Sequence, residues 1–388
     1  MAVGRGGATT KTTLGFLIYG IQGTWKSSLA LEIAKFKRED DKPMRVLFID
    51  AEQGSVDSYL DEYQKKGIDL RNIYLVYTQS LSEVKEFINR AKDNKDFYEY
   101  DELGQETETV YLDADGQPFR PDAIVVDGAT LLFIARQQGL TEFSKLRATV
   151  RAKQKEMTGL EKQVSIQGAA LEIKDYSTLK FDGQDLILDL LGSGKHFIVT
   201  AREEDEKERV RSKDGQFDSV LTGNKIPSGF KDIRYNVKSV IRTYFSDDGI
   251  VKAIVENKDR TLVHRQDEIL IEPTLMDWQV VIDRNKGKKS FVNSNKLANA
   301  VLKELQDAEN KDMTFDKSIL EKSDWSEEIV DPKTVDDFHR VIKIVIESLD
   351  KIKKSEKQGE IYAAGLPKAY QKIEDKEQLK AYLEILKK

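Results

Sequence analysis

The 388-residue chain has no cysteine, only three histidines and only seven prolines. The lack of cysteine excludes disulfides, thiolate zinc sites and cysteine nucleophiles. His196, His264 and His339 lie far apart without the spacing of metal ligands, so we interpret them as structural. No segment has the roughly 18 apolar residues of a transmembrane helix, and the Gly-rich start lacks the apolar stretch of a signal peptide. We therefore expect a cytoplasmic protein with no membrane contact.

The charge balance is mildly acidic, with 62 Lys and Arg against 68 Asp and Glu and a net charge of −6. Phosphate neutralisation supplies most of the non-specific affinity for nucleic acid, so this chain is not expected to coat nucleic acid with its whole surface. Any such contact must be local. Hydrophobic residues make up 39%, enough to bury a core, and the length predicts a large domain with a smaller one appended.

Short apolar segments alternate with longer charged segments of helical period from about residue 14 to residue 263. This alternation predicts an α/β fold, with a mainly parallel sheet between helices. After residue 228, two apolar segments flank a Ser-Asp-Asp-Gly turn and predict an antiparallel hairpin at one sheet edge. The expected strands are residues 15–19, 46–50, 73–76, 123–126 and 196–200, and the expected hairpin strands are 236–245 and 250–257.

Composition divides the chain into an N-terminal segment over residues 1–13, a core over residues 14–288 and a small helical C-terminal domain over residues 289–388. Insertions near residues 97–121 and 139–194 interrupt the core. The first resembles an acidic hairpin, and the second predicts helices around residues 145–162 and 184–191. The C-terminal apolar stripes have helical spacing and predict a buried core: Phe338, Val341, Ile342, Val345, Leu349 and Ile352, then Leu379, Tyr382, Leu383 and Leu386.

Residues 17–29, Leu-Ile-Tyr-Gly-Ile-Gln-Gly-Thr-Trp-Lys-Ser-Ser-Leu, combine a strand, a loop and a helix start in the manner of a phosphate-binding loop. Backbone amides would surround phosphates, Lys26 would supply a positive charge, and the Ser27 hydroxyl would join a Mg²⁺ shell. The pattern usually has glycine before the lysine, and Trp25 stands there instead. The predicted nucleotide-binding residues are Gly20, Ile21, Gln22, Gly23, Thr24, Trp25, Lys26, Ser27 and Ser28.

Acidic or polar residues follow three of the expected strands. Glu52 follows the second strand, which we expect to lie beside the strand of the phosphate-binding loop, and it is the candidate for orienting an attacking water. Asp50 and Glu52 can also be solvated strand ends. Asp127 closes an apolar strand and would hold Mg²⁺ with Ser27. Thr200 and Arg202 end another strand, where they are either nucleotide sensors or structural residues.

These segments resemble the RecA-like P-loop ATPases, and more narrowly the phage-encoded RecA-like family of single-strand annealing and recombination. The resemblance runs over residues 15–260 and rests on the P-loop, on residues 48–52, 125–127 and 200–202. It implies bound ATP and Mg²⁺, catalysis by Glu52 and Lys26, and a homo-oligomer, ring or filament, with ATP between subunits. It also implies that Lys258 and Arg260 reach the ATP of a neighbouring subunit.

In RecA-like proteins the loop after the sensor strand faces DNA. The corresponding residues 203–228 contain candidate DNA contacts among many acidic residues: Lys207, Arg209, Arg211 and Lys213. The leading hypothesis is an ATPase that assembles on single-stranded DNA in recombination, annealing or replication, encoded by a phage and acting in the host cytoplasm. The alternatives are a ring-forming helicase-type motor and a nucleotide-stabilised assembly protein without useful turnover.

Overall fold

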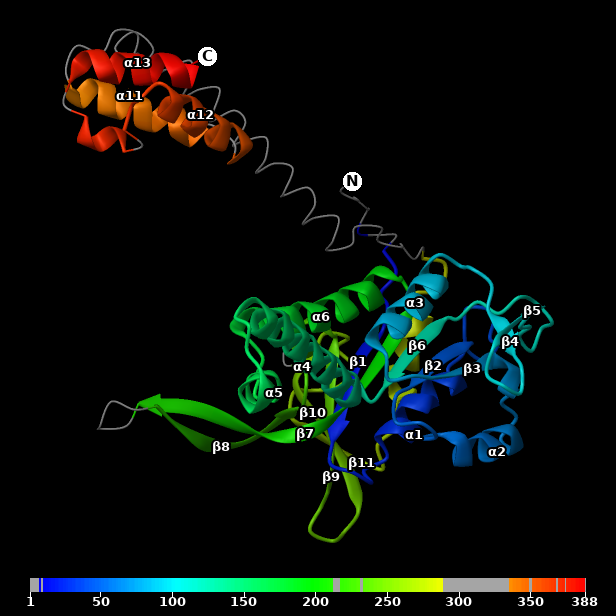
Figure 1. Cartoon of the computed structure of the whole chain (residues 1–388). Coiled ribbons are helices and arrows are strands. Elements are labelled where there is room, and N and C mark those ends of the chain that lie inside the picture. Colours follow the sequence, from blue (N-terminus) through cyan, green and yellow to red (C-terminus); the bar gives the residue numbers. More distant parts are fainter. Residues whose placement is uncertain are drawn as a thin grey trace. The chain divides into compact units, whose positions relative to one another are not determined.

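The computed structural model in Figure 1 describes residues 7, 10–211, 217–230, 233–288, 335–348, 351–367, 369–373 and 375–387. The chain divides into two compact units, Met1–Ala300 and Val301–Lys388, and each is described by itself. The boundary predicted from the sequence, between residues 288 and 289, remains a prediction, because residues 289–334 lie outside the described ranges.

A nine-stranded sheet forms the centre of the first unit, in the order β11-β10-β9-β1-β7-β6-β2-β3, with β8 paired to β7. All pairs from β9 to β3 are parallel, and β10 and β11 extend the edge in antiparallel fashion. The expected parallel strands and the edge hairpin are all present. The strands are β1 Gly15–Gly20, β2 Val46–Asp50, β3 Ile73–Tyr77, β6 Ala123–Asp127, β7 His196–Arg211, β8 Phe217–Pro227, β9 Ser239–Phe245, β10 Val251–Asp259 and β11 Glu268–Ile271.

Helices cover both faces of this sheet, which is why its central strands are apolar along their whole length. Leu17 and Tyr19 of β1 pack into a core with α3, α4 and α6, whereas Phe16 and Ile18 face α1, α2 and α8. The helices are α1 Lys26–Leu31, α2 Asp57–Lys65, α3 Leu81–Lys92, α4 Ala129–Gln154, α5 Gly159–Gln167, α6 Ile173–Gly192, α7 Ile233–Asn236 and α8 Gln279–Asp283, with short 3-10 helices at Glu32–Lys35, Leu70–Asn72 and Met276–Trp278.

The two expected insertions differ in detail from their prediction. The first contains a short antiparallel pair that the sequence did not predict, β4 Tyr98–Tyr100 with β5 Glu106–Val110, and the expected acidic turn follows it, closed by a Leu112–Pro118 bridge. In the second, α4 begins at Ala129, directly after β6, so its first part belongs to the core rather than to an insertion. Helices α5 and α6 complete this region.

Residues 203–228, predicted as a loop, are instead mostly strand. β7 continues far beyond its neighbours and pairs with β8 from Glu203–Pro227 to Arg211–Phe217. Figure 1 shows this two-stranded arm extending away from the core. The run of mixed charge suggested a solvated loop because it contains few apolar residues.

The second unit is a small helical assembly. It contains α11 Val335–Ser348, α12 Lys351–Ala363, a 3-10 helix at Tyr370–Lys372 and α13 Lys376–Lys387. The predicted stripes of α11 and α13 form its buried core, including Phe338, Ile342, Leu379 and Tyr382. Leu349 lies outside the described residues.

The predicted α/β class is confirmed: a mainly parallel sheet lies between helices, and helices form the C-terminal end. Over the described part of the chain, no helix combines the length and apolar character needed to cross a membrane.

Candidate functional site

A cavity of about 400 Å³ opens at the carboxyl ends of the central parallel strands. Register pairs β1 Gly20 with β7 Arg202 and β6 Asp127 with β2 Asp50, so these strands all end at the same edge. Ligands commonly bind at this edge of an open α/β sheet. The cavity is lined by Gln22, Gly23, Trp25, Lys26, Ser27, Ser28, Glu52, Ser55, Tyr59, Asp127, Thr200, Ala201 and Arg202.

The loop between β1 and α1 is fixed by close packing against β9. A Cβ atom at Gly20 would lie 2.2 Å from the carbonyl oxygen of Thr243, so no side chain fits there. Thr24 is buried, and its Oγ1 lies 2.8 Å from the Ile21 carbonyl oxygen and 2.7 Å from Thr243 Oγ1. These contacts hold the predicted phosphate-binding loop to the centre of the sheet.

Trp25 immediately precedes α1 and adopts a left-handed backbone conformation, with φ 61° and ψ 23°. The left-handed region costs a residue with a Cβ roughly 1–2 kcal/mol, which explains why glycine is usual at this position of the pattern. The indole is 55% exposed and lines the cavity at its mouth. The tryptophan thus keeps the conformation of the glycine that it replaces, at a cost in backbone strain.

Lys26 begins α1 and extends into the cavity. Its Nζ donates a hydrogen bond to the Ile21 carbonyl oxygen at 2.8 Å, within the same loop. Burial lowers the pKa of the Lys26 ammonium below its ordinary value, and the nearby carboxylates of Glu52 and Asp127 oppose this shift. A partly desolvated cation in this position is suited to bind phosphate oxygens.

Asp127 ends β6 in a buried position surrounded by hydroxyl groups. Its Oδ2 accepts a hydrogen bond from Ser55 Oγ at 2.6 Å, and Thr200 Oγ1 donates to its Oδ1. Burial raises the pKa of the Asp127 carboxyl, while hydrogen bonds from Ser55, Thr200 and Ser27 oppose the shift. A bound divalent cation would stabilise the ionised form of such a carboxylate.

Thr200 connects two elements of the site. Besides its bond to Asp127, its Oγ1 accepts a hydrogen bond from the Gly128 backbone N–H at 2.8 Å. The hydroxyl proton is therefore directed at the carboxylate rather than into the cavity. The sequence left two roles open for Thr200, a nucleotide sensor or a structural residue. Both hydrogen bonds favour the structural role.

Asp50, at the end of β2, organises the loop that carries Glu52. Its carboxylate accepts four backbone hydrogen bonds at 2.8–3.0 Å, from the N–H groups of residues 52–55. Asp50 is fully buried and is committed to this loop. Of the two acidic residues that the sequence singled out here, only Glu52 points into the cavity.

Glu52 is paired with Arg202 across the cavity. Arg202 Nη2 lies 3.2 and 3.3 Å from the two carboxylate oxygens, and Arg202 Nε lies 3.3 Å from Oε1. A Cβ atom at Gly128 would lie 2.9 Å from Glu52 Cγ, so glycine at this position leaves the space that the glutamate occupies. The predicted catalytic carboxylate and the predicted sensor thus contact each other directly.

The sequence predicted that the Glu52 strand lies beside the P-loop strand, and that prediction is wrong. β7 and β6 lie between β1 and β2 in the sheet. Lys26, Asp127 and Glu52 still meet in one cavity because parallel strands end at a common edge and the loops after them converge. Strand order depends on tertiary packing and cannot be read from local patterns.

The arm carries the predicted DNA contacts, and beyond the register shift that separates Asp205 from Lys207 its basic and acidic side chains lie on different faces. Side chains alternate along a strand and directly paired residues share a face, so Lys207, Arg209 and Arg211 lie on one face with Ser219 and Leu221. The other face carries Glu206, Glu208, Val210, Asp218 and Val220. Among the described residues, the three cations have no carboxylate partner. Lys213 lies outside the described ranges, as do the other residues of 212–216.

Lys258 and Arg260 lie far from this cavity along the sheet. Asp259 pairs with Ser239, and the Arg260 N–H donates to the Lys238 carbonyl oxygen, beside the start of β1 at Gly15. This is the opposite end of the strands from the P-loop. Neither residue can therefore join the cavity of its own chain, and the side chain of Lys258 is outside the described part.

Sequence reasoning missed two cavity residues, Ser55 and Tyr59. Ser55 follows Gly54 in the turn capped by Asp50, and a short Asp-x-x-x-Gly-Ser turn after a strand was the available signal. Tyr59 lies on α2, a segment for which the sequence predicted no functional residue. Within the described ranges, no group of three or more His, Asp or Glu side chains is arranged to hold a metal ion.

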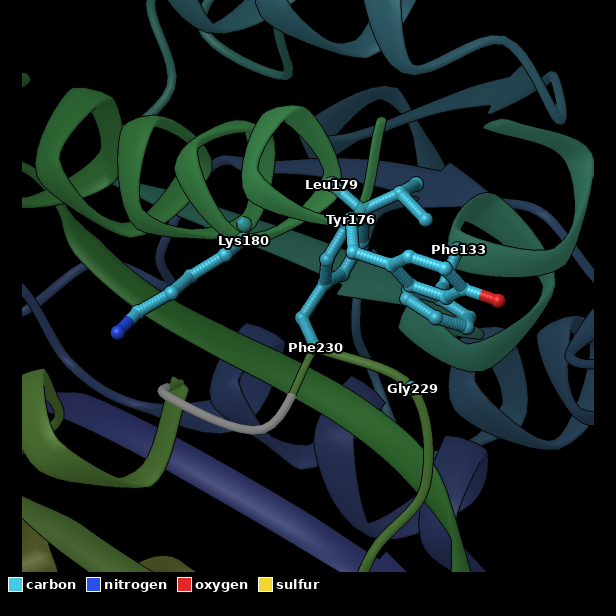
Figure 2. Close-up of a pocket in the computed structure, with 7 residues that line it drawn as sticks. Phe133, Tyr176, Leu179, Lys180, Gly229 and Phe230 are labelled. Carbon is cyan, nitrogen blue, oxygen red and sulfur yellow. The ribbon is translucent and has the colours of Figure 1, made fainter. Parts of the chain in front are cut away.

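A second cavity, of about 330 Å³, has a different character (Figure 2). Tyr176, Leu179 and Lys180 of α6 line it together with Phe133 of α4 and Phe230 after the arm. The ring centroids of Phe133 and Phe230 lie 5.3 Å apart, and Figure 2 shows the Lys180 amine directed away from the aromatic side chains. This apolar lining is unsuited to phosphates and sets the cavity apart from the P-loop site.

Comparison with known proteins gives distant structural likeness only. No family model and no curated protein matches the chain. The structure resembles that of a KaiC-like protein from the hyperthermophilic archaeon Pyrococcus horikoshii OT3, with 14% identity, a TM-score of 0.34, and coverage of 68% of this chain and 89% of the other. It also resembles the RadB recombinase, with 15% identity, a TM-score of 0.36, and coverage of 66% and 84%. Likeness at this level adds nothing to the site geometry.

Proposed function

We propose that the chain binds ATP with Mg²⁺ in the P-loop cavity and hydrolyses it. The observation that carries this proposal is the convergence of Lys26, Glu52 and Asp127, from three distant segments, on one cavity. The loop backbone and Lys26 would hold the phosphates. Hydrolysis by this arrangement depends on positioning and on stabilising developing negative charge.

The residues present fit Mg²⁺ bound together with a nucleotide. Mg²⁺ usually takes only one or two protein ligands beside phosphates and water, so a three-carboxylate cluster is not required. Asp127 and Ser27 are close enough for their side chains to hydrogen-bond and would hold the ion. Bound there, Mg²⁺ would neutralise charge on the phosphates, while Ser55 and Thr200 hold the Asp127 carboxylate in place.

Glu52 is proposed as the residue that orients the attacking water. Asp50 fixes the backbone of its loop, so the glutamate is presented from a rigid turn rather than from a mobile strand end. The other carboxylate that lines the cavity, Asp127, accepts hydrogen bonds from Ser55 and Thr200 and is proposed to hold Mg²⁺, which leaves Glu52 for this role. A positioned general base of this kind contributes about 10²–10⁴-fold to a reaction rate.

Single-stranded DNA is proposed as the macromolecular partner, bound on the basic face of the arm. The segregation of Lys207, Arg209 and Arg211 from the acidic side chains supports this, because one ribbon face then offers phosphates a local positive surface on an acidic protein. Lys213 remains a predicted DNA contact. The proposed setting is recombination, annealing or replication, with a phage-encoded protein acting in the host cytoplasm.

Assembly into a ring or filament, with ATP between protomers, completes the proposal. Arg260 and Lys258 lie at the sheet end opposite to the P-loop, so a contact with ATP is possible only in trans. A helicase-type motor would use the same site and would require hydrolysis-dependent unwinding. A nucleotide-stabilised assembly protein would show nucleotide-dependent oligomers without DNA-stimulated phosphate release.

Nucleotide binding by the Lys26→Ala variant tests the site. Removing the one cation in the loop should abolish ATP binding, measured by calorimetry or by a fluorescent analogue. The matched control is Lys66→Ala, an exposed lysine after α2 outside the cavity, which should bind as the parent does. Affinity of Lys26→Ala within a few-fold of the parent would overturn the assignment of the P-loop.

A further inference from the structure

Arg202 forms an ion pair with Glu52, the carboxylate that is proposed to orient the attacking water. Both oxygens of Glu52 lie 3.2–3.3 Å from the guanidinium, which makes a forked contact. A carboxylate whose oxygens accept guanidinium hydrogen bonds has those lone pairs engaged and cannot accept a water proton along the same directions. While it persists, the pair therefore competes with water for the Glu52 oxygens.

Arg202 is also the residue at which β7 leaves the sheet and enters the arm. Its carbonyl oxygen accepts the Ser228 N–H at 2.7 Å, and the first rung of the arm, Glu203 with Pro227, follows directly. The hydroxyl of Thr130 accepts the Arg202 N–H at 2.9 Å and donates to the Ser228 carbonyl oxygen at 3.0 Å. One hydroxyl thus joins both strands at the root of the arm.

Strand β7 carries residues of both the cavity and the basic face of the arm. Thr200 is bonded to Asp127, Arg202 to Glu52, and Lys207, Arg209 and Arg211 form the basic face further along. The paired strands β7 and β8 link the basic face to Arg202 through one register shift, between Asp205 and Lys207. Because the pairing resumes on both sides of this shift, a displacement of the arm would reach Arg202 through the β7 backbone.

We propose that Arg202 is a positioning residue that restrains Glu52, and that a strand of DNA held on the arm withdraws this restraint. The inference rests on the proposed ATPase function and deepens it, because it makes hydrolysis depend on the arm. An exposed ion pair of this type is worth about two- to fivefold in an equilibrium or a rate. Release of the pair would therefore raise the ATP turnover number by about that factor. Any further stimulation of turnover by DNA would come from assembly.

Steady-state ATP hydrolysis by the Arg202→Gln variant, with and without single-stranded DNA, tests this inference. The DNA-free turnover number should rise about two- to fivefold and the DNA-stimulated one should stay near the parent value, so that the stimulation ratio falls by the same factor. Arg202→Lys keeps a charge without the fork and should fall between the two. Thr130→Val should retain DNA affinity and show a smaller stimulation ratio.

A fall in turnover of Arg202→Gln under both conditions would overturn the inference, because it would show that Arg202 contacts the nucleotide in the reaction. Unchanged DNA-free turnover would overturn it as well. A thermal-stability cycle of Glu52→Gln, Arg202→Gln and the double variant needs no catalysis. Non-additive melting temperatures support the pair, and additive ones contradict it. A parent chain without any turnover would instead refute the proposed function, whatever the cycle gives.

Discussion

Asp50 and Asp127 lie directly opposite each other at the ends of β2 and β6, yet their carboxylates have different partners. Asp50 accepts four backbone N–H groups of the following loop, whereas Asp127 is surrounded by hydroxyls and borders the cavity. Two acidic strand ends that look alike in sequence are therefore a structural residue and a candidate metal ligand.

This difference predicts opposite phenotypes for the two positions. Asp50→Ala should lower the free energy of unfolding by about 2–4 kcal/mol, because it removes the partners of buried amides. Asp127→Asn should abolish Mg²⁺-dependent turnover, retain nucleotide binding and melt no lower than the parent without Mg²⁺, because it removes a buried charge. Denaturant unfolding and phosphate release measure the two effects. A parent-like stability of Asp50→Ala would refute the first assignment.

Trp25→Gly restores the usual loop sequence and tests whether the tryptophan is a tolerated departure. Glycine adopts a φ of 61° without strain, and its greater freedom in the unfolded chain offsets part of the gain, so unfolding should become harder by up to about 1 kcal/mol. Nucleotide binding should persist, and turnover should be equal or higher. Complete loss of nucleotide binding would show that the indole is part of the binding site.

The two faces of the arm provide a matched pair of variants. Replacing Lys207, Arg209 and Arg211 by alanine should weaken single-strand affinity and reduce the salt dependence by about two units, since each single-strand phosphate contact contributes about 0.7. Glu208→Gln with Asp218→Asn changes the opposite face and should leave affinity equal or higher. Fluorescence anisotropy over a salt series measures both. Equal effects of the two variants would refute a face-specific site.

Because His196 is buried, we predict that the free energy of unfolding falls in mild acid. His196 lies at the start of β7, where its Nδ1 accepts the Leu14 N–H, and burial lowers the pKa of this imidazole from 6.5 to about 4. The unfolded chain binds the proton first, so stability is complete above pH 6.5 and falls as the pH drops toward 4, by up to about 3 kcal/mol.

The His196→Asn variant isolates this effect, because asparagine keeps a hydrogen-bond acceptor near Nδ1 but does not titrate. Its unfolding free energy should depend less on pH than that of the parent between pH 4 and 6.5. Chemical denaturation at several pH values provides the measurement. Parallel pH profiles for the two proteins would contradict the assignment of a buried neutral histidine.

Much of the sheet and of the cavity could be predicted from the sequence because both depend on local patterns. Buried parallel strands are apolar along their length, and residues after them gather at one edge, so Lys26, Glu52 and Asp127 could be selected without coordinates. The Ser55 hydroxyl was missed because its contact with Asp127 depends on the Asp50 turn, for which the only signal was the Asp-x-x-x-Gly-Ser pattern after the strand.

Strand order and the arm required the structure. The residues of β2, Val46–Asp50, do not indicate that two strands separate β2 from β1 in the sheet. In the arm, Glu206 and Glu208 alternate with Lys207 and Arg209, a period of two that is typical of a strand and was available in the sequence. The density of charge suggested a loop because solvated strands lack the apolar alternation used to recognise them.

The central claim, that this cavity hydrolyses ATP through Glu52, is tested most directly by Mg²⁺-dependent phosphate release from the parent and Glu52→Gln proteins. Glu62→Gln, at an exposed position on α2, is the matched control. We predict turnover by the parent and the control, and a loss of about 100-fold or more in Glu52→Gln with ATP still bound. A Glu52→Gln rate within a few-fold of the parent, or no phosphate release by the parent with or without single-stranded DNA, would contradict the claim.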